Sequence, residues 1–282
     1  MNDVSTIALG QTHTLEVVKE VDFGLYLNAG NLGEVLLPIK YEPEFINIGD
    51  SLEVFVYLDS EKRPIATTQT PKAKVGEFAY LRVNDVNKVG AFLDWGLDKD
   101  LLVPFSEQHR TMEEGKSYLV YVYINDADGR IVASSKVDKF AEDENEDLEP
   151  KQAVELIIAN STELGYKAVV NHRYWGVLYS NEVFQTLSFG QRINGFVKRI
   201  REDGKIDLVL QIAREVRDTH SGTIVEYLDK QTNGFAPLHD KSDPELIKKT
   251  FSMSKKAFKR AIGGLYKDGV LEIRDDGIRL ID

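Results

Sequence analysis

Pairs of glycines recur along this chain at one fixed interval, and no other feature constrains its fold as strongly. In three places a glycine inside a strand-like run is followed 25 residues later by a second glycine that opens another such run. The pairs are Gly24 and Gly49, Gly90 and Gly115, and Gly165 and Gly190. A basic residue and a short apolar run close each repeat, in the sequences RPIATTQ, RIVASSK and KIDLVLQ. Self-similarity of this kind predicts three copies of one structural unit.

The second repeat shows the expected content of one copy. It contains short runs rich in β-branched and aromatic residues, bounded by Gly, Asn and Asp, which is the pattern of strands and turns. These runs are Tyr80–Val83, Ala91–Asp94, Leu101–Pro104, Lys116–Ile124 and Arg130–Ser134. Five short strands in about 65 residues predict a small closed barrel, which buries its own strand edges.

After about residue 215 the apolar residues recur at helical spacing instead. Ser242 or Asp243 is suited to cap a helix, with Pro244 in its first turn. The expected elements are a helix ending near Gln231, a second from this cap to about Thr250, a third from Ser254 to Gly269, and a hairpin turning at residues 275–277. Three helices and a terminal hairpin describe a winged helix. Gly263 and Gly264 in the third helix are interpreted as a site of close helix packing.

The net charge of −11 is distributed unevenly. We expect five segments, whose net charges are −7 for barrel 1 (1–70), −1 for barrel 2 (71–140), −6 for an acidic linker (141–150), +3 for a divergent barrel 3 (151–214) and 0 for the winged helix (215–282). The C-terminal half is therefore the expected polyanion binder. Solvation is the favoured interpretation of the acidic linker. The alternative is that it competes with a polyanion for the basic surface beside it.

Composition and motifs argue against several other classes of protein. The chain has no cysteine, so a disulfide framework or a thiolate metal site is excluded. It shows neither a signal-like N-terminus nor an apolar run of membrane-spanning length. Its five histidines are scattered without metal-ligand spacing, and no phosphate-binding glycine loop of the Gly-x-x-x-x-Gly-Lys type occurs. We therefore expect a cytoplasmic protein that is not an enzyme, with no cofactor, no metal and no membrane association.

The sequence around the first glycine of each repeat resembles the S1 RNA-binding domain. KVGAFLDWGLDKDLLVPFSEQ matches best, DFGLYLNAGNLGEVLLPI matches well, and ELGYKAVVNHRYWGVLYSNEV is divergent. Three such domains followed by a winged helix are similar to the conserved virulence factor B family. The resemblance implies a multidomain, mainly β chain of three five-stranded OB-fold barrels of the S1 type followed by an α/β winged-helix domain. It also implies a bacterial, cytoplasmic RNA-binding regulator of virulence genes.

The same resemblance implies an RNA-binding face with an aromatic residue before the first glycine, a second two residues after it, and a histidine on the third strand. These places hold Phe23, Tyr26 and Pro38 in the first repeat, Val89, Phe92 and Pro104 in the second, and Leu164, Lys167 and Tyr179 in the third. Strand alternation directs Tyr26, Phe92 and Lys167 outward, whereas Phe23 fits a core position at least as well. Tyr26 and Phe92 are candidates for base stacking, with the covering of a neighbouring domain as the alternative.

Charge favours the third repeat and the last helix as the main RNA site, because neutralising phosphates supplies most sequence-independent affinity. The candidate RNA-binding residues are Lys167, Arg173, Tyr174, Tyr179, Lys198, Arg199, Arg201, Lys255, Lys256, Lys259 and Arg260. For the barrel, the alternative is a solvated basic edge with Tyr174 and Trp175 in the core. For the helix, the alternatives are a solubilising face or entry into a DNA major groove.

The primary hypothesis is a non-catalytic, post-transcriptional regulator that binds single-stranded RNA with low sequence specificity. A DNA-binding transcription regulator acting through the winged helix is the second hypothesis. The third is a protein–protein scaffold whose barrels no longer bind nucleic acid.

Overall fold

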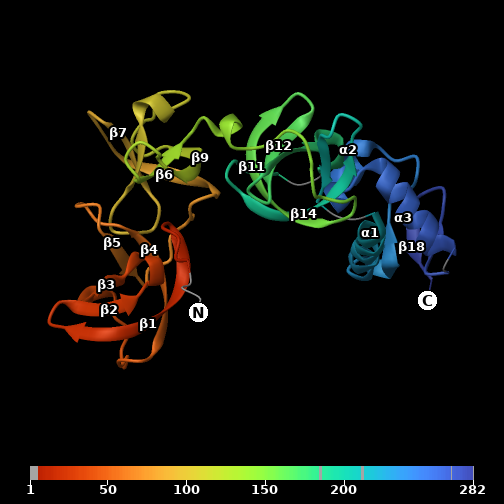
Figure 1. The fold of residues 1–282 in the computed structure, drawn as a ribbon. Helices are drawn as coiled ribbons and strands as arrows, with labels where there is room; N and C mark the ends of the chain where they lie inside the picture. Colours follow the sequence, from red (N-terminus) through yellow and green to blue (C-terminus); the bar gives the residue numbers. More distant parts are fainter. Residues whose placement is uncertain (1–5, 184–185, 211–212, 268, 282) are drawn as a thin grey trace. The chain divides into compact units, whose positions relative to one another are not determined.

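The computed structural model describes residues 6–183, 186–210, 213–267 and 269–281. The chain separates into two compact units, Met1–Glu142 and Asp143–Asp282. Within the described residues, the first unit holds two small β-barrels, and the second holds a third barrel and a winged helix (Figure 1). The predicted fold class is confirmed. Among the described helices, none has the length and apolar character that a membrane span requires.

Barrels 1 and 3 are closed and share one strand order. Barrel 1 consists of β1 (Gln11–Val21), β2 (Gly24–Asn28), β3 (Glu34–Pro38), β4 (Ser51–Leu58) and β5 (Pro64–Thr67), in the order β1-β2-β3-β5-β4. Barrel 3 consists of β11 (Ala153–Thr162), β12 (Gly165–Val170), β13 (Tyr174–Tyr179), β14 (Arg192–Ile200) and β15 (Ile206–Val209), in the order β11-β12-β13-β15-β14. In both barrels the third strand pairs in parallel with the fifth, and the ladders between the other neighbouring strands are antiparallel.

Barrel 2 has the same sequence of strands with one seam open. It consists of β6 (Phe78–Asn87), β7 (Gly90–Asp94), β8 (Leu101–Pro104), β9 (Ser117–Ile124) and β10 (Ile131–Ser134), ordered β10-β9-β6-β7-β8. The two end strands, β8 and β10, lie close together without a hydrogen-bonded ladder. Barrel 2 is therefore nearly closed, and its strands match the five runs predicted from the second repeat.

Backbone geometry explains why the first glycine of each pair recurs. Gly24, Gly90 and Gly165 open the second strand of their barrels with φ of 153°, 155° and 146°. A Cβ atom at these positions would lie 2.1–2.3 Å from a backbone carbonyl oxygen of the third strand. Any other residue would clash there, so the repeat in the sequence records a close approach of two strands.

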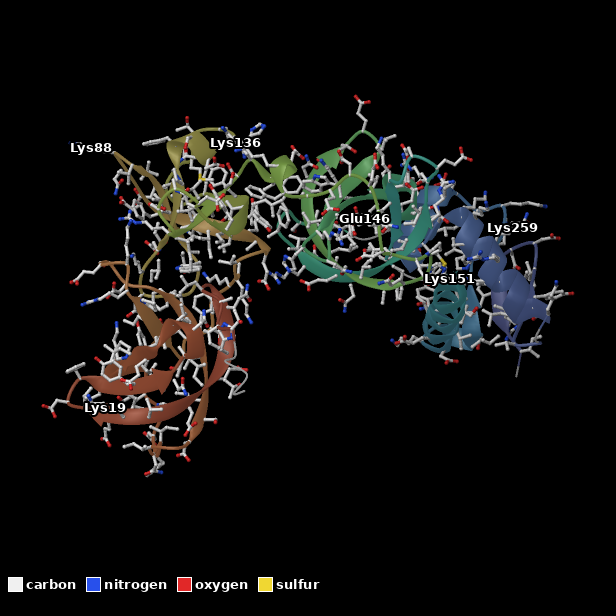
Figure 2. The ribbon with its side chains drawn as sticks, viewed as in Figure 1. Lys19, Lys88, Lys136, Glu146, Lys151 and Lys259 are labelled. Atoms are coloured by element: carbon white, nitrogen blue, oxygen red, sulfur yellow. The ribbon has the colours of Figure 1, made fainter. Side chains whose placement is uncertain are left out.

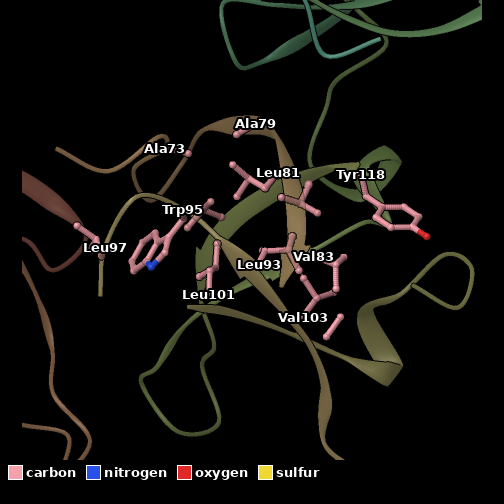
Figure 3. Packing of buried hydrophobic residues seen from close by; sticks show 14 of the residues in the cluster. Ala73, Ala79, Leu81, Val83, Leu93, Trp95, Leu97, Leu101, Val103 and Tyr118 are labelled. Atoms are coloured by element: carbon pink, nitrogen blue, oxygen red, sulfur yellow. The ribbon is translucent and has the colours of Figure 1, made fainter. Parts of the chain in front are cut away.

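Barrels 1 and 2 share one hydrophobic cluster within the first unit. In β4, Val54 and Val56 face the core of barrel 1, whereas the alternate residues Phe55 and Tyr57 pack into the cluster of barrel 2. Phe55 lies edge-on against Trp95, with ring centroids 5.8 Å apart. Figure 3 shows Trp95 among the buried residues of that cluster. Strand β4 is thus buried on both faces, because the second barrel covers what would otherwise be its outer face.

The winged helix contains α1 (Ala213–Asp229), β16 (Phe235–Ala236), α2 (Pro244–Phe251), α3 (Lys255–Lys267), β17 (Leu271–Ile273) and β18 (Ile278–Leu280). The three strands form one sheet in the order β16-β18-β17. The Asp243 side chain accepts hydrogen bonds from the backbone N–H groups of Glu245 and Leu246, so it caps α2 as predicted. On α3, Phe258, Ile262 and Leu265 are buried in the hydrophobic core of the domain.

The interpretation of Gly263 and Gly264 as a site of close helix packing is wrong for the described residues. A Cβ atom at either position would meet no atom within 4 Å. Each glycine lowers helix stability by about 1 kcal/mol relative to alanine, and no internal contact explains that cost. The two glycines instead leave part of the α3 backbone bare.

Candidate nucleic-acid interface

One row of residues crosses the outer face of barrel 3 from strand to strand. Cross-strand pairing joins Asn160 to Lys167, Lys167 to Val177, Val177 to Asp207, and Asp207 to Arg199. These five residues belong to five different strands, and Lys167 faces outward as its alternation predicted. The row places a cation near the middle of the face and a second cation at its end.

A β-bulge at Lys198 enlarges the basic end of this row. The pairing register of β14 with β15 shifts between Val197 and Arg199, so one extra residue stands on β14. Val197 is buried in the core, and both Lys198 and Arg199 are exposed. Regular alternation would have turned one of these two cations inward. The bulge therefore presents consecutive basic side chains on the surface.

A pocket of about 380 Å³ opens on the same face. Lys167, Trp175 and Val177 line it, together with Arg201 and Lys205 from the end of the barrel. The Lys167 ammonium lies 3.8 Å from the centroid of the Trp175 ring, which places a cation over the aromatic face. Its lining of Leu164, Val177 and Trp175 surfaces with cations at the rim suits a planar apolar group that carries negative charge.

Asp207 organises the cations beside this pocket. Its carboxylate is fully buried and accepts hydrogen bonds from Arg199 Nε at 2.6 Å and Arg201 Nε at 2.8 Å. The Tyr179 hydroxyl donates to the same carboxylate at 3.2 Å and accepts a hydrogen bond from Arg201. Burial alone would raise the pKa of Asp207, but the two arginines outweigh it and hold the pKa below its ordinary value. Three predicted site residues therefore meet in one network.

The segment before barrel 3 supplies carboxylates to two other predicted residues. Arg173 pairs with Glu146 at 2.6 Å and with Asp147 at 3.2 Å. The Tyr174 ring is 1% exposed, and its hydroxyl donates to Asp147 at 2.7 Å. Burial and this hydrogen bond raise the pKa of Tyr174 to about 12. The Tyr174 ring thus belongs to the barrel core, as the alternative reading of these aromatics held.

The acidic segment as a whole packs against barrel 3. Leu148 is buried in the barrel core, and the Asn145 backbone N–H donates to the Gly204 carbonyl at 2.9 Å. Asp143 lines the pocket that Lys167 and Arg201 also line. Figure 2 shows Glu146 over this barrel. Several of its carboxylates therefore lie beside the predicted RNA-binding cations.

Helix α3 presents its basic residues toward a cleft within the second unit. Lys256, Lys259 and Arg260 line this cleft of about 1030 Å³, whose other wall includes Asn181 and Asn194 of barrel 3. Lys259 projects from α3 (Figure 2) and lies 3.4 Å from Asp240. Lys255 is partly buried and does not line the cleft.

Lys198 pairs with Glu182, which also lines this cleft. The structure therefore brings three of the four predicted helix cations to the same cleft as barrel 3, and it places Lys255 elsewhere.

Barrels 1 and 2 carry their own outer rows. Tyr26 lies between Lys19 and Leu36 in the pairing register, and Phe92 lies between Asp85 and Leu102. Both aromatics are partly exposed and flanked along their strands by buried residues, so they face outward.

Phe23 is 56% exposed, which makes the core reading of this residue wrong. Val21 pairs with Gly24, so Phe23 occupies a two-residue turn where strand alternation does not apply. Its ring lies edge-on to Tyr26, with centroids 6.5 Å apart.

Two residues of the interface were missed or undervalued at the level of sequence. Trp175 entered only as a core residue; it is 6% exposed, but it also forms a wall of the pocket. Asp207 was not singled out, although the aligned repeat ends hold a signal for it. Asp207 stands two residues after the closing basic residue, where the other repeats have Ile65 and Val132. Among the described residues, no group of three or more His, Asp or Glu side chains is placed to hold a metal ion.

Comparison with known proteins identifies the modules and the chain. A family model described as the S1 domain matches residues 9–69 and 75–136, and one described as the CvfB-like winged helix domain matches residues 222–280. An uncharacterized protein, YitL of Bacillus subtilis, is 31% identical over 92% of this chain and 89% of its own length. The chain belongs to the conserved virulence factor B family. Membership in this family and the S1 domains support a regulator that binds nucleic acid.

Other members of the family are more distant in sequence but match over nearly their whole length. Conserved virulence factor B of Staphylococcus aureus is 27% identical over 96% of this chain and 94% of its own length. A solved structure from Streptococcus pneumoniae, described as a multidomain protein with nucleic acid binding domains, is 25% identical. It covers 97% of this chain and 98% of its own, with a TM-score of 0.40.

Proposed function

We propose that this chain is a non-catalytic, cytoplasmic RNA-binding protein that regulates gene expression after transcription. It holds single-stranded RNA on the outer face of barrel 3 and on the basic residues of α3. The observation that carries the proposal is the pocket formed by Lys167, Trp175 and Arg201, with Arg199 beside it. The name of the Staphylococcus relatives supports a role in virulence regulation.

The chemistry of this face supports RNA rather than another polyanion. A single strand offers unstacked bases that enter apolar pockets, and an aromatic wall such as Trp175 stacks on them. Arginine side chains with exposed terminal nitrogens bind phosphate oxygens in a bidentate manner. Barrel 3 carries a net charge of +3, whereas barrel 1 carries −7. The aromatic candidates Tyr26 and Phe92 would then add at most weak stacking contacts in the first unit.

Helix α3 extends the proposed RNA surface. Lys256, Lys259 and Arg260 line the cleft whose opposite wall is barrel 3, so a strand bound on the barrel reaches cations on the helix. The winged helix alone is electrically neutral, which disfavours a strong DNA complex made by this domain without the barrel.

The test measures binding of the full chain to a labelled single-stranded RNA of about 16 nucleotides. Affinity is compared with that for duplex DNA of the same sequence, from about 50 to about 200 mM salt. We expect tighter binding to RNA with a clear salt dependence. Lys256→Ala/Arg260→Ala should lower the magnitude of the salt slope by about 1.

The matched control removes two exposed cations from barrel 2, as Lys88→Ala/Lys116→Ala. This control should leave the affinity and the salt slope unchanged. A preference for duplex DNA would instead favour a transcription regulator acting through α3. Binding to neither nucleic acid would favour a protein scaffold, and a flatter slope in the barrel 2 control would move the site to the first unit.

A further inference from the structure

Barrel 3 buries a carboxylate at a position that the other two barrels fill with apolar residues. Asp207 pairs with Arg199 across β15 and β14. The corresponding pairs are Ile65 with Tyr57 in barrel 1, and Val132 with Tyr123 in barrel 2. Ile65 and Tyr57 pack into the cluster of barrel 2, and Tyr123 lies against Phe140 with ring centroids 5.2 Å apart. An ion pair therefore replaces an apolar contact only in barrel 3, among the described barrels.

Stability alone does not account for this replacement. Burying a carboxylate costs several kcal/mol before its partners compensate for lost hydration. Replacing a buried ion cluster with well-packed apolar residues is often neutral or stabilising, and barrels 1 and 2 show that the position accepts them. The cluster therefore calls for an explanation other than folding.

The geometry of the hydrogen bonds supplies one. Both Arg199 and Arg201 donate to Asp207 through Nε, and Arg201 donates through a terminal nitrogen to the Tyr179 hydroxyl. The Arg199 side chain remains 64% exposed. Within the described residues, no hydrogen bond involves the terminal nitrogens of Arg199, so these nitrogens are available to a ligand. An arginine held in this way has already lost side-chain freedom that binding would otherwise cost.

We propose that Asp207 is a positioning residue that holds Arg199, Arg201 and Tyr179 as a preformed clamp for a backbone phosphate of single-stranded RNA. The clamp adjoins the pocket, because Arg201 belongs to both. A phosphate on the arginines thus places its neighbouring base at the Trp175 wall. This inference rests on the proposed function and names the group that fixes the register of RNA on barrel 3.

The proposal and simple electrostatics predict opposite outcomes for one substitution. Asp207→Val installs the residue type of barrels 1 and 2 and raises the net charge of barrel 3 by one. If charge alone mattered, RNA affinity would rise. If Asp207 positions the arginines, affinity falls by about tenfold, because two arginine side chains must be ordered on binding.

Two further variants of the full chain keep this test decisive. Asp207→Asn retains the shape of the side chain and adds the same charge, so we expect a smaller loss of affinity. Asp203→Asn serves as the matched control, because Asp203 is exposed, pairs with Lys205 on the same barrel and does not contact Asp207. It should bind RNA as well as the wild type or better. Unfolding curves of each variant confirm that the fold is retained, and Asp207→Asn carries the test if Asp207→Val does not fold.

A spectroscopic signature separates positioning from a structural role. In the wild type, the Nε–H resonances of Arg199 and Arg201 should be dispersed and protected from exchange, and both features should disappear in Asp207→Asn. Affinity of the Asp207 variants equal to or above that of the wild type, as in Asp203→Asn, would overturn the clamp while leaving RNA binding intact. Absence of RNA binding by the wild type would overturn the clamp and the proposed function together.

Discussion

Phe55 of barrel 1 packs edge-on against Trp95 of barrel 2, with the ring centroids 5.8 Å apart. Both rings are almost fully buried, although they belong to different repeats. Tyr41 adds a polar contact across the same junction by donating to Asp98 at 2.8 Å. The first two repeats therefore form one structural body rather than two linked barrels.

Phe55→Ala is expected to destabilise the first unit by about 3–5 kcal/mol, as loss of a buried phenylalanine generally does. Denaturant unfolding followed by fluorescence measures this change. Phe45→Ala is the matched control, because Phe45 is in the same barrel and 94% exposed. It should change the free energy of unfolding by less than about 0.5 kcal/mol. Equal effects of the two substitutions would contradict a shared core.

Gly264→Ala is expected to raise the free energy of unfolding of the winged helix by up to about 1 kcal/mol. The position is helical and open, so alanine gains helix propensity without a clash. Gly90→Ala should lower stability by about 1–3 kcal/mol, because its φ is 155° and its Cβ would lie 2.3 Å from the Val103 carbonyl oxygen. Thermal unfolding of both variants measures the contrast. Destabilisation by Gly264→Ala would show that α3 needs a bare backbone for its own packing.

Glu146→Gln/Asp147→Asn is expected to tighten RNA binding about twofold to tenfold. The two carboxylates pair with Arg173, and exposed ion pairs of this kind contribute about 0.2–1 kcal/mol each. Asparagine at 147 retains an acceptor for the Tyr174 hydroxyl. Glu113→Gln/Glu114→Gln removes the same charge from exposed positions of barrel 2 and should leave the affinity unchanged. The same gain in both double variants would indicate a general charge effect instead of competition by the acidic segment.

Asp207→Asn is expected to destabilise the second unit in a pH-dependent manner. The pKa of Asp207 is lower in the folded chain than its ordinary value, so its ionised form stabilises the fold. That contribution is complete above the ordinary carboxyl pKa of about 4 and is lost as the pH falls through the lower folded-state pKa. The difference in Tm between wild type and variant should be greatest near neutral pH and shrink on acidification. A difference that does not vary with pH would contradict the role assigned to the arginines.

The fold was predictable because its constraints are local. Gly24, Gly90 and Gly165 mark strand contacts that tolerate no side chain, and Asp243 with Pro244 marks the start of a helix. The sharing of β4 between two barrels was not predictable, although the run Val54–Tyr57 is apolar throughout. Such a run indicates burial on both faces but does not name the element that covers the second face.

The candidate site was predictable in its residues but not in its pairing. Arg199 and Arg201 were identified as surface cations, yet their partner Asp207 stands on a neighbouring strand and depends on the register around a bulge. Arg173 likewise meets Glu146 and Asp147, which come from a segment interpreted as solvated. A count of charges along the chain treats these groups as independent, whereas the fold joins them into clusters with a much smaller net charge.

The outer row of each barrel ends at one equivalent crossing of the fourth and fifth strands. In barrel 1 that crossing, Tyr57 beside Ile65, is used for contact with the next barrel, and in barrel 3 it holds Arg199 beside Asp207. Joining a neighbour and presenting charge to solvent are mutually exclusive uses of the same patch. Duplication of the repeat therefore allowed a division of labour, in which one copy gave up this patch to assembly and another kept it open for chemistry.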